Sequence, residues 1–156
     1  MNLNRWMYAG GHPNALARAL NRVWAIIWAA GLWPNRMNTL EVRGRRSGRR
    51  ISLPVVVADL DGERYLVAML GDGVAWVANV RAAQGAAVLR HGRRENVWLE
   101  EVEPQQRAPI LRRYLQVAPG ARAHFPVDWH AAPGDFERVA ADHPVFRVHA
   151  AADRAG

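Results

Sequence analysis

The chain has 156 residues, half of them hydrophobic, and a formal net charge of +7 at neutral pH. This length supports one domain with a hydrophobic core. There is no cysteine and no lysine, so disulfides, thiolate metal sites, Schiff-base chemistry and P-loop phosphate binding are excluded. The lack of cysteine favours a cytoplasmic protein, and the positive charge suits nucleic acid, an anionic membrane surface or a small polyanion.

The N-terminal part, residues 1–34, is predicted to contain an amphipathic helix within residues 14–33. Its apolar positions recur every three or four residues, and Gly31 and Pro34 end the pattern. Its apolar stretch, residues 23–33, is about half as long as the roughly 20 residues that a membrane span requires. We therefore expect this helix to pack on the globular domain of residues 35–156, to cover an apolar pocket, or to contact the inner face of the cell membrane.

The next segment predicts two strands, residues 39–43 and 51–60, joined by a strongly basic turn. Five arginines occur within the eight residues 43–50, around a Gly-Arg-Arg-Ser-Gly sequence. The planar guanidinium donates paired hydrogen bonds to phosphate, and backbone N–H groups of a glycine turn can add to the same site. The turn is thus either an anion site or a solvated basic hairpin tip. Pro54 predicts that the strand of residues 51–60 is either interrupted there or lies at an edge of the sheet.

The rest of the chain alternates short strands and helices. Asp61-Gly62 predicts a hairpin. The other predicted elements are strands at 65–70, 86–90, 96–102 and 144–149, helices at 74–84, about 107–117 and 135–141, and a long loop at 118–133. Two hairpins separated by a helix favour a largely antiparallel sheet or barrel over a doubly wound fold.

Two other site types are not expected. His124, Asp128 and His130 lie close together in the long loop, but their spacing matches no familiar zinc pattern, so we predict no metal site. The tryptophans fall at helical and strand-inward positions rather than among the arginines, so nucleic-acid binding is not predicted.

Several segments, taken in order, resemble the deazaflavin-dependent nitroreductase family. They are Gly44-Arg45-Arg46-Ser47-Gly48, Leu53-Pro54-Val55, the Asp61-Gly62 hairpin, Val67-Ala68-Met69-Leu70-Gly71 and Trp76-Val77-Ala78-Asn79-Val80-Arg81-Ala82, and the similarity runs over residues 37–149. The resemblance implies an α+β fold: a split β-barrel of about six mostly antiparallel strands, with an N-terminal amphipathic helix and short flanking helices. It also implies coenzyme F420, a deazaflavin with a phosphodiester and a tail of glutamates.

The resemblance assigns expected roles to individual residues. The phosphodiester and tail would contact Arg45, Arg46, Ser47, Gly48 and Arg50. The ring system would lie over Leu53, Pro54 and Val55 and meet backbone groups of Ala68, Met69, Leu70 and Gly71, while Trp76 and Asn79 would fix the adjoining loop.

The implied activity is hydride transfer from reduced F420 to a planar apolar acceptor, quinone-like or nitroaromatic. A quinone-like acceptor is the first choice, because the N-terminal helix would place the pocket at a membrane surface. Tyr65, Tyr114 and His124 are the candidates for proton delivery. The alternative is a noncatalytic protein that binds the coenzyme or an apolar ligand on the same barrel. The oligomeric state is not predicted.

Overall fold

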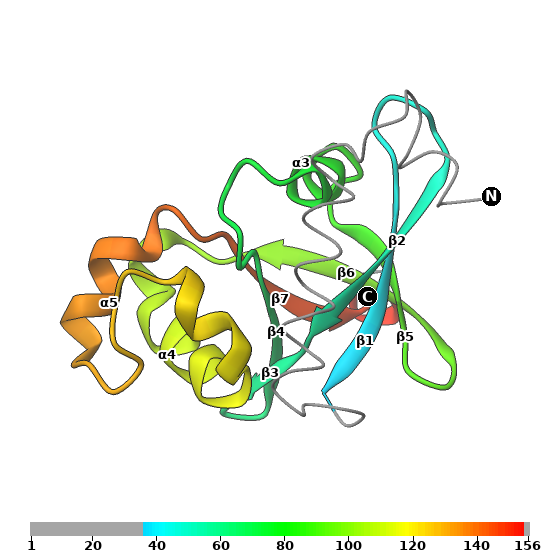
Figure 1. The fold of residues 1–156 in the computed structure, drawn as a ribbon. Coiled ribbons are helices and arrows are strands. Elements are labelled where there is room, and N and C mark those ends of the chain that lie inside the picture. Colours follow the sequence, from blue (N-terminus) through cyan, green and yellow to red (C-terminus); the bar gives the residue numbers. More distant parts are fainter. Residues whose placement is uncertain (1–35, 155–156) are drawn as a thin grey trace.

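The computed structural model describes residues 36–154 of the chain. The predicted N-terminal helix of residues 14–33, with its expected membrane contact, lies outside the described residues. The described part is an α+β fold built on one curled antiparallel sheet (Figure 1).

The sheet has seven strands in the order β2-β1-β5-β6-β7-β4-β3, and every neighbouring pair is antiparallel. Their bounds are β1 Met37–Arg43, β2 Arg50–Val56, β3 Ala58–Leu60, β4 Glu63–Val67, β5 Ala86–Arg90, β6 Arg94–Glu101 and β7 Val145–Ala150. The two edge strands β2 and β3 are separated by Val57 alone, so the sheet must curl until its edges approach each other. The curled sheet agrees with the predicted barrel. The strand predicted at 51–60 is in fact two strands, because the chain passes at Val57 from one edge of the sheet to the other.

Two local predictions are confirmed, one for a strand and one for a turn. Pro54 lies opposite Thr39 in β2, which is an edge strand, and edge strands are where a sheet tolerates proline. Asp61 and Gly62 connect β3 to β4, and both have positive φ, 51° and 81°. Two consecutive positive φ values are typical of the tight hairpin turn that matches strand twist.

The helices are short and lie around the sheet. They are α3 Ala75–Ala82, α4 Ala108–Val117, α5 Pro133–Ala140 and α6 Ala151–Arg154, with 3₁₀ turns η1 Pro104–Gln106 and η2 Pro119–His124. Helix α4 begins just after Arg107, as predicted, because Pro109 is tolerated in the first turn, where its N–H would have no helical partner. Helices α4 and α5 pack side by side beyond β3 and β4, whereas α3 lies near the β1–β2 hairpin (Figure 1).

Two hydrophobic clusters form the core. The barrel cluster lies on the inner side of the curled sheet and is closed by α3; it includes Leu40, Leu53, Val55, Leu66, Ala68, Val77, Val80, Leu89 and Phe146. The helix-side cluster joins the sheet to α4 and α5; it includes Tyr65, Met69, Leu111, Tyr114, Leu115, Phe125, Phe136 and Val145. Strand β4 contributes to both clusters because its successive side chains point to opposite faces.

Among residues 36–154, no helix combines the length and the apolar character needed to cross a membrane.

Candidate functional site

The basic segment between β1 and β2 is an ordered turn. Gly44 N–H donates to the Arg49 carbonyl (2.7 Å), and Gly48 N–H donates to the Gly44 carbonyl (2.9 Å). Gly48 has a φ of 70°, which favours glycine. A Cβ on Gly44 would lie 2.8 Å from Ser47 Oγ. Glycines at both positions therefore let the turn close tightly while its arginine side chains extend outward.

Arg45 fastens this turn to helix α3. Its backbone N–H and its Nη1 both donate to Asn79 Oδ1, at 3.1 and 2.8 Å, and Nη1 also approaches the Ala75 carbonyl at 3.5 Å. Asn79 is buried, with 3% exposure. Two predicted site residues from distant parts of the chain are thus in direct contact, and Asn79 fixes the position of the turn.

The turn carries cations that no acidic side chain in the described range neutralises. Arg43, Arg46 and Arg49 are exposed and form no ion pair within residues 36–154. Arg45 has the amide oxygen of Asn79 as its partner rather than a carboxylate. The turn therefore has strong positive charge available to an anion.

Arg50 leads to a second group of charges, here named the Glu41 cluster and made of Glu41, Arg50, Arg90 and Arg94. The Glu41 carboxylate is 4% exposed and lies 3.4 Å from Arg50, 3.1 Å from Arg90 and 3.0 Å from Arg94. Three guanidinium groups on strands β2, β5 and β6 thus surround one carboxylate on β1. This cluster was not predicted from the sequence, because its members lie on four different strands.

A groove of about 460 Å³ lies between the basic turn and strand β5. This volume is within the usual range of small-molecule pockets, about 300–1,000 Å³. The groove is lined by residues of both the turn and the Glu41 cluster. Among them are Glu41, Arg43, Gly48, Arg50 and Asn96.

The predicted ring-contact residues divide between the two hydrophobic clusters. Leu53, Val55 and Ala68 are buried in the barrel cluster, and Trp76 packs half-buried against it. Met69 is buried in the helix-side cluster instead, and Leu70 packs against that cluster. The Trp76 ring lies 5.6 Å from the ring of Phe146. Trp76 and Asn79 lie on the same helix, so α3 connects this apolar surface to the arginine turn.

The segment 68–71 is held by the chain just before β7. Ala68 N–H donates to the Pro144 carbonyl (2.9 Å), and the Ala68 carbonyl accepts a hydrogen bond from His143 Nδ1 (3.2 Å). Burial lowers the pKa of His143, so its ring is neutral at pH 7 and Nδ1 carries the proton. Of residues 68–71, Leu70 is the one whose N–H has no backbone partner in the described range.

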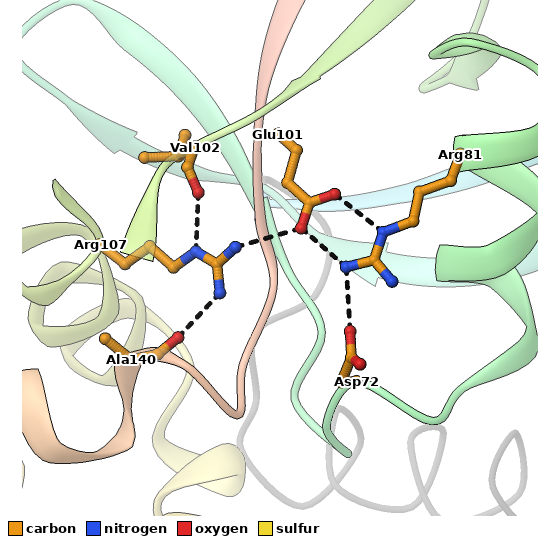
Figure 2. Close-up of polar contacts among 6 residues, drawn as sticks. All are labelled: Asp72, Arg81, Glu101, Val102, Arg107 and Ala140. Atoms are coloured by element: carbon orange, nitrogen blue, oxygen red, sulfur yellow. Dashed lines mark hydrogen bonds and ion pairs between the residues drawn. The ribbon is translucent and has the colours of Figure 1, made fainter. Parts of the chain in front are cut away.

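The buried side chain of Arg107 connects the end of strand β6 to helix α5 (Figure 2). Its side chain is 5% exposed and donates to the carbonyls of Val102 (2.8 Å) and Ala140 (2.9 Å) and to Glu101 (3.1 Å). Burial lowers the pKa of Arg107, and the carboxylate of Glu101 partly opposes that effect. One guanidinium thereby joins β6, α5 and the start of α4.

Glu101 extends the same network to the loop after β4 (Figure 2). It accepts two hydrogen bonds from Arg81 of α3, at 2.8 and 2.7 Å, and Arg81 also donates to Asp72 at 2.9 Å. The hydrogen bonds from Arg81 lower the pKa of Glu101 and raise that of Arg81. The network therefore fixes the Gly71–Gly73 loop relative to α3 and β6.

Two of the three candidates for proton delivery, Tyr65 and Tyr114, share the helix-side cluster with the predicted ring contact Met69. Tyr65 and Tyr114 are buried in the helix-side cluster, and Tyr65 Oη accepts a hydrogen bond from Arg147 (3.3 Å). Burial raises the pKa of the Tyr114 phenol. His124 is half-buried at the end of η2. Their role in proton delivery stays a prediction.

Residues 36–154 contain no group of three histidine, aspartate or glutamate side chains placed to hold a metal ion. Within the loop, His130 Nδ1 lies 3.0 Å from Asp128, and the Trp129 ring stacks under Arg122 at 3.7 Å. These contacts give the loop local order.

The arrangement of a curled antiparallel sheet with short flanking helices is shared with several solved structures. An F420-H2-dependent reductase, FDR-A, is 16% identical, with a TM-score of 0.51 over 73% of this chain and 94% of that chain. The conserved hypothetical protein Rv2991 from Mycobacterium tuberculosis is 17% identical, with a TM-score of 0.53 over 81% and 79%. A pyridoxinephosphate oxidase family protein from Clostridium acetobutylicum is 11% identical, with a TM-score of 0.50 over 80% and 82%.

At these low identities, the structural similarity shows a common fold alone. Comparison of the sequence with protein-family models and with curated proteins finds no match. The chain thus has a fold on which an F420-H2-dependent reductase is built.

Proposed function

We propose that this chain is an oxidoreductase that takes a hydride from reduced coenzyme F420 and passes it to a planar apolar acceptor, quinone-like or nitroaromatic. The observation that carries the proposal is the arginine turn. It holds several cations that have no acidic partner in the described part of the chain, and Asn79 docks it onto the helix that also carries Trp76. The fold shared with FDR-A, an F420-H2-dependent reductase, also supports this proposal.

The side chains of the turn fit an anionic coenzyme. Arg45, Arg46, Ser47, Gly48 and Arg50 would hold the phosphodiester and the tail through charge-assisted hydrogen bonds. Because hydrogen bonds already order the glycine turn, binding of the coenzyme would cost less conformational entropy there. Such a donor set is better matched to a carrier with several negative charges than to a neutral ligand.

The apolar residues fit the ring system. Leu53, Pro54, Val55 and Trp76 would form its apolar support, and the braced segment of residues 68–71 would present backbone groups, including the Leu70 N–H. When bound, the deazaflavin supplies the hydride, and the protein aligns the acceptor and excludes water. The described residues contain no cysteine or lysine to serve as a covalent nucleophile.

A fluorescence titration with purified F420 tests the proposal. We expect binding in the wild type, weakened by about 1–3 kcal/mol in Arg46→Ala because one charge-assisted contact is lost. Arg138→Ala is the matched control, since Arg138 is exposed on α5 and its ion pair among residues 36–154 is with Asp135. Unchanged affinity in both Arg46→Ala and Arg45→Ala would show that the turn does not bind the coenzyme.

An acceptor screen then separates an enzyme from a noncatalytic binding protein. The reductase oxidises reduced F420 when a quinone or nitroaromatic compound is added. Binding of F420 without oxidation by any acceptor would favour the noncatalytic alternative, and tighter binding of FMN than of F420 would contradict the choice of coenzyme.

A further inference from the structure

A second pocket lies at the end of the sheet opposite the arginine turn and is here named the mouth pocket. Its volume is about 530 Å³, which is within the range of small-molecule sites. Figure 1 shows the β5–β6 hairpin, which contributes to this pocket, and the β1–β2 turn at opposite ends of the sheet. The polar residues that line the mouth pocket include Asn38, Asp59, Arg64, His91, Arg93 and Glu95.

The mouth pocket is polar although it opens on the inner side of the curled sheet. Asn38, Arg64 and Glu95 each precede an apolar residue of the barrel cluster by two positions. Those apolar residues are Leu40, Leu66 and Val97. Residues two positions apart on a strand face the same way, and β1, β4 and β6 run in the same direction because antiparallel strands separate them. The inner face therefore changes from apolar to polar on all three strands at the same end.

Hydrogen bonds fix the walls of the mouth pocket. Val57 N–H donates to the Arg36 carbonyl (2.8 Å), which joins the crossing between β2 and β3 to the start of β1. His91 Nδ1 lies 2.9 Å from the Met37 carbonyl, and because a carbonyl can only accept, Nδ1 carries the proton. The Nε2 atom of His91 forms no hydrogen bond among residues 36–154 and is available to a ligand.

The two carboxylates of the mouth pocket already have arginine partners. Both oxygens of Glu95 accept hydrogen bonds from Arg64, at 2.9 and 2.8 Å. Asp59 pairs with Arg36 and, at 3.2 Å, with Arg113 of α4.

Arg93 is the remaining cation of the mouth pocket. It is exposed on the hairpin, and its guanidinium has no hydrogen bond and no ion pair in the described range. Asn38 lies at the start of β1, and its amide is likewise without a hydrogen bond there. The pocket therefore offers a free guanidinium, a free amide and the Nε2 atom of His91 to a ligand.

A ligand matched to these groups brings its own negative charge. A guanidinium donates paired hydrogen bonds to the two oxygens of a carboxylate or of a phosphate, and the Asn38 amide can donate to the same group. We infer that the mouth pocket is a second ligand site, separate from the proposed coenzyme site, for a small molecule with a carboxylate or phosphate group that Arg93 binds.

NMR titration of the His91 ring tests the inference at the site itself. The probes are inorganic phosphate and acetate, each added at constant ionic strength so that general screening does not change. We expect the ring Cε1–H signal of His91, assigned with His91→Gln, to shift and saturate. The anion that binds more tightly identifies the group that the site takes. Arg93→Gln should weaken this binding about fivefold, because one charge-assisted contact at an exposed site is lost.

Two control variants separate this pocket from general attraction of anions to a basic protein. Arg138→Gln removes the same charge from α5, and Arg46→Ala removes a cation from the arginine turn. Both should leave the His91 titration as in the wild type. The inference is overturned if neither anion gives a saturating shift of the His91 signal, or if Arg93→Gln binds as tightly as the wild type.

Discussion

Replacing Arg107 with methionine tests the network that positions the loop after β4 (Figure 2). The change leaves the buried carbonyls of Val102 and Ala140 without their donor, at about 1–3 kcal/mol each. Glu101 also loses one of its two cationic partners. The apolar methionine offsets part of this cost by filling the same space. We therefore expect a net loss of about 3 kcal/mol in the free energy of unfolding.

Urea unfolding followed by tryptophan fluorescence measures this loss. For a chain of this size, about 3 kcal/mol corresponds to a fall in melting temperature of roughly 6–12 °C. The matched control is Arg138→Met, whose side chain is 79% exposed, and its expected change is within about 0.5 kcal/mol. A loss below about 1 kcal/mol in Arg107→Met, with an unchanged urea slope, would refute the stabilising role of the network.

Two further predictions concern the turn and the acid response. Asn79→Ala removes the acceptor of two hydrogen bonds from Arg45 and should weaken F420 binding about tenfold, because the turn loses its anchor; an unchanged dissociation constant in titration would contradict this. The lowered pKa of Glu101 contributes stability that is complete above its unfolded value near 4.5 and is lost as pH falls through the folded value. The stability difference between wild type and Glu101→Gln should therefore shrink in urea titrations as pH falls below about 4.5, and a constant difference would show that Glu101 is not the group responsible.

The candidate site was partly predictable because its signals are local. The concentration of arginine between two glycines is visible in sequence, and so is the apolar run that contains Leu53 and Val55. Its supporting contacts were not predictable. His143 bonds Ala68 across 75 positions, and Arg45 bonds Asn79 across 34. A local sequence pattern cannot identify a contact between two residues that only the folding of the chain brings together.

The sequence by itself determined the types of element and the places where the chain turns. Glycine, proline and the alternation of apolar residues act through local backbone sterics, so the Asp61-Gly62 hairpin followed from residue type, and Pro54 limited its strand to an interrupted or an edge position. The tertiary structure decided that the predicted strand of residues 51–60 divides at Val57, because only curling of the whole sheet brings its two edges together. It also decided which arginines remain available for a ligand, since the position of each carboxylate depends on strand register rather than on sequence distance.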